Sequence, residues 1–102
     1  MDLKLEGKTA VVTGGSVGIG KAIALCLAQE GVDVAICARR KDVLDDTAAE
    51  IARATNRKIV PLVADLTKTE DANAFIEGAA EALGRIDILV NNAGAAAGGT
   101  LE

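Results

Sequence analysis

Glycines are the residues whose spacing points most clearly to chemistry. Four of the 11 glycines in this 102-residue chain stand at positions 14, 15, 18 and 20, directly after the apolar run 10–12. If a helix begins at this turn, its unpaired N–H groups and partial positive charge attract phosphate. We expect Gly14 and Gly18 to permit the turn and the close approach of a dinucleotide pyrophosphate. Gly20 should let the helix pack tightly on a sheet.

The alternative is a glycine-rich turn that binds no ligand. The spacing is Gly-x-x-x-Gly-x-Gly rather than the common Gly-x-Gly-x-x-Gly, so the motif alone is a weak signal. A strand before the turn and a helix after it favour dinucleotide binding, because that is the context in which such a turn holds phosphate.

The residues that several other kinds of site require are missing from this sequence. It has no His, Tyr or Trp, so these residues supply no imidazole base, no His-containing metal site and no tyrosine acid. A net charge of −4 and a single aromatic residue, Phe75, argue against nucleic acid as a partner. No apolar run is long enough to span a membrane, and the charged N-terminus lacks a signal-peptide core. Cys26 and Cys37 stand in apolar surroundings, which predicts two buried free thiols and a cytoplasmic protein.

Four strands would position the glycine turn. They are predicted at residues 8–13, 32–38, 58–64 and 85–90. Pro61 interrupts the third of them, which should therefore lie at a sheet edge, because proline cannot donate to a ladder. The tail, residues 91–102, is rich in Ala and Gly and shows no period.

Three helices are expected between the strands. The first runs from Ile19 to a C-cap at Gly31, and the second begins at Asp42 or Asp45. The third has capping-box spacing at Thr67 and Glu70 and ends at Gly84. Their inward residues should be Ile19, Ile23, Cys26 and Leu27, then Leu44, Ala48 and Ile51, then Ala72, Phe75, Ile76, Ala79 and Leu83.

The resulting order, β-α-β-α-β-α-β, predicts an α/β fold with a parallel sheet covered on both faces. Right-handed crossovers and an edge third strand favour the strand order 3-2-1-4, which is part of a Rossmann-type doubly wound sheet. We expect residues 1–102 to form one NAD(P)-binding half-domain. Its ligand should lie at the carboxyl ends of the strands, between the first and the fourth, where the strand order reverses.

The end of the second strand indicates which dinucleotide binds. NAD-binding proteins usually place an acid about 20 residues beyond the glycines, where it holds the ribose hydroxyls. This chain has Ala38, Arg39 and Arg40 there. A guanidinium binds a 2′-phosphate with two hydrogen bonds, whereas a carboxylate repels it. We therefore expect NADP rather than NAD, with Arg39 as the main contact and Arg40 or Lys41 assisting; the alternative is a solvated start of a helix.

At this point the chain resembles the short-chain dehydrogenases/reductases, over essentially its whole length. Residues 13–20, TGGSVGIG, resemble the TGxxxGIG cofactor loop of that family. Asp65 and Leu66 resemble its adenine-contacting acid and the residue after it, which makes a backbone contact. Residues 91–94 resemble its NNAG motif, and Arg39 resembles the basic residue of NADP-preferring members such as 3-oxoacyl reductase-like enzymes. The cofactor contacts that the resemblance implies are Gly14, Ser16, Gly18, Ile19, Gly20, Asp65, Leu66, Asn92, Ala93 and Gly94.

The resemblance implies an oxidoreductase that transfers hydride between nicotinamide and a carbonyl or alcohol substrate. In the family a tyrosine is the general acid/base, a lysine four residues later lowers its pKa, and a serine polarises the substrate oxygen. These groups lie downstream of the NNAG motif, and the 102 residues contain no tyrosine. We therefore expect no catalytic residue and no activity from these residues alone, and a homo-oligomer for a full-length enzyme.

Three interpretations remain open from the sequence. The residues are the N-terminal part of an NADP(H)-dependent oxidoreductase, or a non-catalytic NADP(H)-binding module, or a structural fragment that binds no cofactor. We favour the first. A rise in melting temperature with NADPH would exclude the third, because a ligand that binds only the folded state stabilises it.

Overall fold

The computed structural model describes residues 5–14 and 18–92, and it contains the alternation that the sequence predicts. The elements, in chain order, are β1 (Thr9–Thr13), α1 (Gly18–Gln29), β2 (Asp33–Ala38), α2 (Lys41–Thr55), β3 (Ile59–Val63), α3 (Thr69–Leu83) and β4 (Ile88–Asn91). None of the described helices is both long enough and apolar enough to cross a membrane.

The four strands form one parallel sheet in the order β3-β2-β1-β4, which confirms the predicted topology. In the central pair, Val11 lies opposite Ala35 of β2, and on the other side of β1 it lies opposite Leu89 of β4. Pro61 is in β3, at one edge of the sheet, as its missing N–H requires. β4 forms the other edge.

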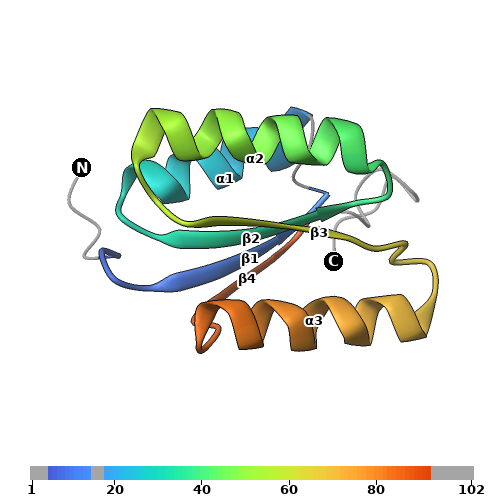
Figure 1. The fold of residues 1–102 in the computed structure, drawn as a ribbon. Coiled ribbons are helices and arrows are strands. Elements are labelled where there is room, and N and C mark those ends of the chain that lie inside the picture. Colours follow the sequence, from blue (N-terminus) through green and yellow to red (C-terminus); the bar gives the residue numbers. More distant parts are fainter. Residues whose placement is uncertain (1–4, 15–17, 93–102) are drawn as a thin grey trace.

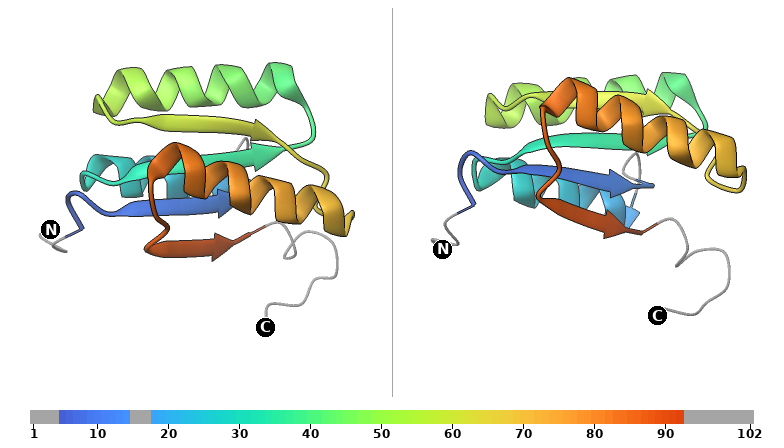
Figure 2. Two further views of the ribbon diagram at one scale, coloured as in Figure 1. Left: turned by 60° about the horizontal axis from the view of Figure 1, so that its bottom comes forward. Right: turned by 90° about the horizontal axis from the view of Figure 1, so that it is seen from below.

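Helices cover the sheet on both faces, and the coverage is unequal. Figure 1 shows α1 and α2 together on one face and α3 alone on the other. α3 packs against β3, β2 and β1, and the view from below in Figure 2 shows β4 lying beside it rather than under it. Leu89 on β4 is consequently 59% exposed.

Alternating strand residues divide the core into two clusters. Ala10, Val12, Val34 and Ile36 face the α1 and α2 side, where they pack with Leu44 and its neighbours. The α3 side is smaller, and its buried residues are Val11, Ala35, Cys37, Ala64, Phe75 and Ala79. Strands buried on both faces explain why β1 and β2 are nearly continuous apolar runs.

The buried face of α1 differs from the one that the sequence predicts. Ile19 is 70% exposed and Cys26 is also exposed, whereas Gly20, Ala24 and Ala28 are buried. Small residues at a spacing of four let the helix axis approach the sheet closely, and the larger apolar side chains are left on the flanks or in solvent. The prediction that both cysteines are buried is therefore wrong for Cys26 and correct for Cys37.

The starts of α2, α3 and β4 also differ from the sequence prediction, and each of the other elements begins one residue away from its predicted start. α2 begins at Lys41 after Arg40, and α3 begins at Thr69 after Lys68; neither preceding side chain caps its helix. The capping box at Thr67 does not form, because α3 begins at Thr69 and its N-cap position is Lys68; the Thr67 hydroxyl donates to Asp65. β4 begins at Ile88 rather than at residue 85. The inward residues Leu44, Ala48 and Ile51 of α2, and Phe75 and Ala79 of α3, are buried as predicted.

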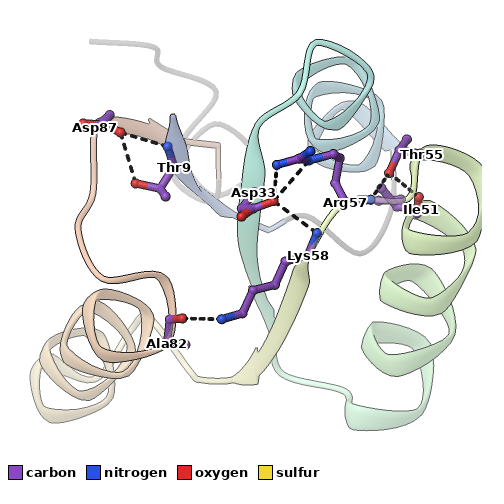
Figure 3. Close-up of polar contacts among 8 residues, drawn as sticks. All are labelled: Thr9, Asp33, Ile51, Thr55, Arg57, Lys58, Ala82 and Asp87. Carbon is purple, nitrogen blue, oxygen red and sulfur yellow. Dashed lines mark hydrogen bonds and ion pairs between the residues drawn. The ribbon is translucent and has the colours of Figure 1, made fainter. Parts of the chain in front are cut away.

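Polar side chains join the elements at the amino-terminal edge of the sheet (Figure 3). The Asp33 carboxylate accepts from the guanidinium of Arg57, with the Arg57 Nη2 atom at 3.0 Å, and from the Lys58 N–H. The Lys58 ammonium donates to the carbonyl of Ala82 at the end of α3. The Asp87 carboxylate accepts from the Thr9 N–H at 2.9 Å. These charged side chains are paired with groups of the fold itself. The predicted site residues lie at the opposite edge of the sheet.

Candidate dinucleotide site at the carboxyl edge of the sheet

The predicted site residues leave the sheet at one edge. Because the strands are parallel, the segments that follow Thr13, Ala38, Val63 and Asn91 all start at the carboxyl edge. β1 connects to β2 on one side and pairs with β4 on the other, so the strand order reverses between β1 and β4. Ligands of doubly wound sheets bind in the crevice at such a reversal.

The described part of the glycine turn is closely packed. Gly14 follows β1 with φ +68°, and its N–H donates to the carbonyl of Cys37 in β2 at 3.0 Å. A Cβ atom at Gly20 would lie 2.1 Å from the Gly14 carbonyl oxygen, a separation that excludes any side chain. The turn therefore needs glycine at position 20 so that the first turn of α1 can rest against the end of β1. Ser16, a predicted cofactor contact, lies outside the described residues.

Gly18 has a different environment from Gly20. Its φ of +58° is left-handed, which residues with side chains rarely adopt, and among the described residues no non-neighbouring atom lies within 4 Å of the position that a Cβ would occupy. The backbone at the start of α1 therefore borders open space. Ile19, the next residue, is largely exposed. A helix N-terminus beside open space is suited to an anion, because its first N–H groups have no partner within the helix.

Thr13 joins this turn to the end of β4. Its hydroxyl lies 3.1 Å from Asn91 Oδ1 and 3.3 Å from the Val90 carbonyl, and it accepts from the Asn92 N–H at 2.8 Å. The Asn92 amide nitrogen lies 3.0 Å from the position of a Cβ on Gly20. Asn92 is thus brought next to the glycine turn, while Ala93 and Gly94 lie outside the described residues. Thr13 was not among the predicted site residues. The sequence feature that could have indicated its role is its position at the end of a buried strand.

The basic residues after β2 are exposed, and two of the three are paired. Arg40 Nη2 lies 3.0 Å from Asp42 Oδ2, and the Lys41 ammonium pairs with Asp45 one helical turn later. The Arg40 side chain lowers the pKa of Asp42, and the hydrogen bond from Lys41 to Asp45 raises the pKa of Lys41. Arg39 makes no ion pair within the described part of the chain. Of the three basic residues after β2, it is the one that forms no ion pair with a described residue.

Asp65 is held by hydrogen bonds in the loop after β3. Its Oδ1 atom accepts from the hydroxyl of Thr67 at 2.6 Å and from the Thr67 N–H at 3.0 Å. Its own N–H donates to Asp71 Oδ2 at 2.9 Å. The hydrogen bonds from Thr67 lower the pKa of Asp65, and the positive charges of Lys68 and Arg39 act in the same direction. Leu66 follows it and packs against the α3-side cluster.

The carboxyl edge of the sheet brings together three features. It combines a helix N-terminus, a cation at Arg39 and an ionised acceptor at Asp65, which suit a ligand with phosphates and an amino-bearing group. The residues 5–14 and 18–92 contain no group of three or more Cys, Asp and Glu side chains arranged to hold a metal ion.

The chain is similar to a family of known oxidoreductases. A family model described as short chain dehydrogenase matches residues 8–102. An uncharacterized oxidoreductase of Methylorubrum extorquens is 42% identical over 91 residues, covering 89% of this chain and 37% of that protein. The 3-oxoacyl-acyl-carrier-protein reductase of rhamnolipids biosynthesis from Pseudomonas aeruginosa is 42% identical over 98 residues, covering 96% of this chain and 38% of that protein.

A solved structure is similar over the same region. L-sorbose reductase from Gluconobacter frateurii, complexed with NADPH and L-sorbose, superposes with a TM-score of 0.88 at 38% identity. The match covers 91% of this chain and 35% of that chain. The chain thus spans about a third of the length of the curated relatives it matches.

Proposed function

The chain belongs to the short-chain dehydrogenase family, and we propose that it is the N-terminal dinucleotide-binding part of an NADP(H)-dependent oxidoreductase. The proposed reaction is hydride transfer between nicotinamide and a carbonyl or alcohol substrate. The observation that carries the proposal is that a side chain at Gly20 would clash with the Gly14 carbonyl, so the backbone of the first turn of α1 lies directly against the end of β1, where the strand order reverses. A dinucleotide pyrophosphate is the ligand for which this geometry is suited.

The residues present fit the cofactor. Gly14, Gly18 and Gly20, with Ser16 and Ile19 in the same turn, would hold the pyrophosphate through backbone N–H groups. Arg39, assisted by Arg40, would hold the 2′-phosphate of NADP, although Arg40 must first exchange its bond to Asp42. Asp65 and Leu66 would contact the adenine, and Asn92, Ala93 and Gly94 would line the remaining wall. When bound, the cofactor supplies the hydride.

The part of the reaction assigned to residues 1–102 is binding and orientation. The tyrosine, lysine and serine on which the family depends are proposed to lie elsewhere in the enzyme, since the chain has no tyrosine. NADP is proposed because basic residues rather than an acid stand directly after β2 and Arg39 makes no ion pair with a described residue; NAD is the alternative. A cytoplasmic homo-oligomer is proposed as the working form; both Cys26 and Cys37 are free thiols, which suits a reducing compartment.

Thermal unfolding with and without cofactor tests this function. At a concentration of NADPH about 100 times its Kd, the melting temperature should rise by roughly 10 °C. NADH at the same concentration should give a smaller rise. An unchanged melting temperature with both dinucleotides would contradict the proposed function. A larger rise with NADH would leave dinucleotide binding intact and overturn the assignment of NADP.

A further inference from the structure

The loop between β3 and α3 contains a hydrogen-bond arrangement that the motif at Asp65 does not explain. Thr67 donates twice, from its hydroxyl at 2.6 Å and its N–H at 3.0 Å, and both bonds go to the same oxygen, Oδ1 of Asp65. No group in the described part of the chain donates to the other oxygen, Oδ2. The carboxylate therefore has one oxygen fully used by the protein and one with its lone pairs available.

The backbone of the same loop is fixed from two sides. The Asp65 N–H donates to Asp71 Oδ2 at 2.9 Å, and the Asp65 carbonyl accepts from the Lys68 N–H at 3.0 Å. Asp71 lies in the first turn of α3, so the loop is tied to a helix rather than only to itself. With the main chain held by Asp71 and Lys68, the two bonds from Thr67 determine how the carboxylate is oriented.

Charge and hydrogen bonding act together on the state of Asp65. Thr67 lowers its pKa most, and the charges of Lys68 and Arg39 lower it further, while partial burial opposes them. An ionised carboxylate accepts hydrogen bonds and donates none. A ligand group that meets Oδ2 must therefore be a donor, such as the exocyclic amino group of a purine, and a carbonyl oxygen in the same place would be repelled.

We propose that Thr67 is a positioning residue that keeps one Asp65 oxygen occupied and leaves the other to accept from the bound base. The site thereby selects adenine over hypoxanthine, in which a carbonyl replaces the amino group. This inference rests on the proposed function, because it concerns the base of the same dinucleotide. The proposed selectivity for adenine depends on the hydrogen bond from the Thr67 hydroxyl to Asp65, and not on Asp65 alone.

The test compares NADP⁺ with nicotinamide hypoxanthine dinucleotide phosphate by calorimetry. The wild-type protein should bind NADP⁺ more tightly. Thr67→Val removes the hydroxyl at nearly constant volume, and it should reduce the preference for NADP⁺ by roughly 3- to 10-fold. Thr67→Ser keeps the hydroxyl and should retain the preference. Thr69→Val is the matched control, because it makes the same chemical change two residues away, at a threonine whose side chain forms no hydrogen bond with the described residues.

A second readout does not depend on any ligand. The pKa of Asp65, followed by NMR of its carboxyl carbon, should rise in Thr67→Val and stay unchanged in Thr67→Ser and Thr69→Val. If Thr67→Val binds NADP⁺ with the wild-type base preference, or leaves the pKa of Asp65 unchanged, the inference is overturned while the proposed function stands. If the folded wild-type protein binds neither dinucleotide, the proposed function fails and the inference fails with it. Thr67→Ala, measured alongside, gives the same comparison should the valine variant not fold.

Discussion

Gly20 faces the Gly14 carbonyl so closely that even a methyl group at position 20 would lie 2.1 Å from its oxygen. Because this oxygen belongs to the backbone at the end of a central strand, it cannot move aside as a flexible side chain would. The first turn of α1 and the end of β1 are thus fitted to each other through two glycines.

Gly20→Ala should therefore displace the glycine turn, lower the melting temperature and weaken dinucleotide binding by at least about tenfold, since pyrophosphate contacts depend on the position of the backbone. Gly78→Ala is the matched control. Its Cβ would meet Leu62 at 3.5 Å, an ordinary contact, and replacing glycine inside a helix should stabilise α3 by about 0.5–1 kcal/mol. Calorimetry and thermal melts check both variants; wild-type affinity in Gly20→Ala would refute the role of this contact.

Arg39→Asp should weaken NADPH binding by roughly 10- to 100-fold and move the preference towards NADH, because it replaces the available cation with a group that repels the 2′-phosphate. Arg53→Asp makes the same charge change in the last turn of α2, about 18 Å along the helix axis from the start of α2. It should leave the ratio of the two affinities unchanged. Calorimetry with NADPH and NADH measures the ratio. An equal loss in both variants would mean that Arg39 acts only through net charge.

The two cysteines should differ sharply in reactivity. Cys26 is exposed on α1, whereas Cys37 is buried and burial raises the pKa of its thiol. A thiol reagent at neutral pH should modify one thiol per folded chain rapidly and two after denaturation, because the thiolate is the reacting form. Cys26→Ser should remove the rapid reaction. Rapid modification of two thiols in the folded protein would contradict the burial of Cys37.

Asp87 should make stability depend on pH. Its carboxylate accepts from the Thr9 N–H, which lowers the pKa of Asp87 below the ordinary value of 3.8. A lowered pKa in the folded state stabilises the fold above that value, and the contribution is lost as the pH falls through the folded-state pKa. Asp87→Asn should therefore melt at a lower temperature than wild type at pH 7, and the difference should shrink below about pH 4. Asp46→Asn, which removes a carboxylate from the exposed side of α2, is the matched control for the loss of one negative charge. A difference in melting temperature between wild type and Asp87→Asn that stays constant across this pH range would contradict the role of Asp87.

The strand order was predictable from the sequence because the signals are local and strong. Val11 and Ala35 lie in nearly continuous apolar runs, Pro61 marks the edge strand, and Gly31 and Gly84 end their helices. Each of these features depends on one residue or one short segment. The reversal of strand order, and with it the place of the candidate site, follows from the same signals.

The buried face of α1 was not predictable in the same way. Hydrophobic periodicity gives weight to large residues such as Ile19 and Cys26, but the sheet is met by Gly20, Ala24 and Ala28. Small residues are buried here because the helix lies close to the strands. That close approach depends on the contact between Gly20 and Gly14. Because Gly14 lies outside the helix, the hydrophobic pattern of α1 alone does not reveal this contact.

Hydrogen bonds between side chains of distant segments were also not predictable from the sequence. Thr9 and Asp87 are 78 residues apart, and Thr13 meets Asn91 across two strands. The pairing of Thr67 with Asp65 is local, yet the same threonine also fits a capping box, and composition does not decide between the two. The candidate site was therefore predicted as a set of loops, while the bonds that position it required the structure.

The most direct test of the central claim is a map of backbone amide NMR shifts as NADP⁺ is added to the folded protein. If the carboxyl edge binds the dinucleotide, the largest changes should fall at Gly14, Gly20, Arg39, Leu66 and Asn92, and the amides of Thr9, Asp33, Lys58 and Asp87 at the opposite edge should change little. Changes centred on the amino-terminal edge, or none at saturating NADP⁺, would contradict the account.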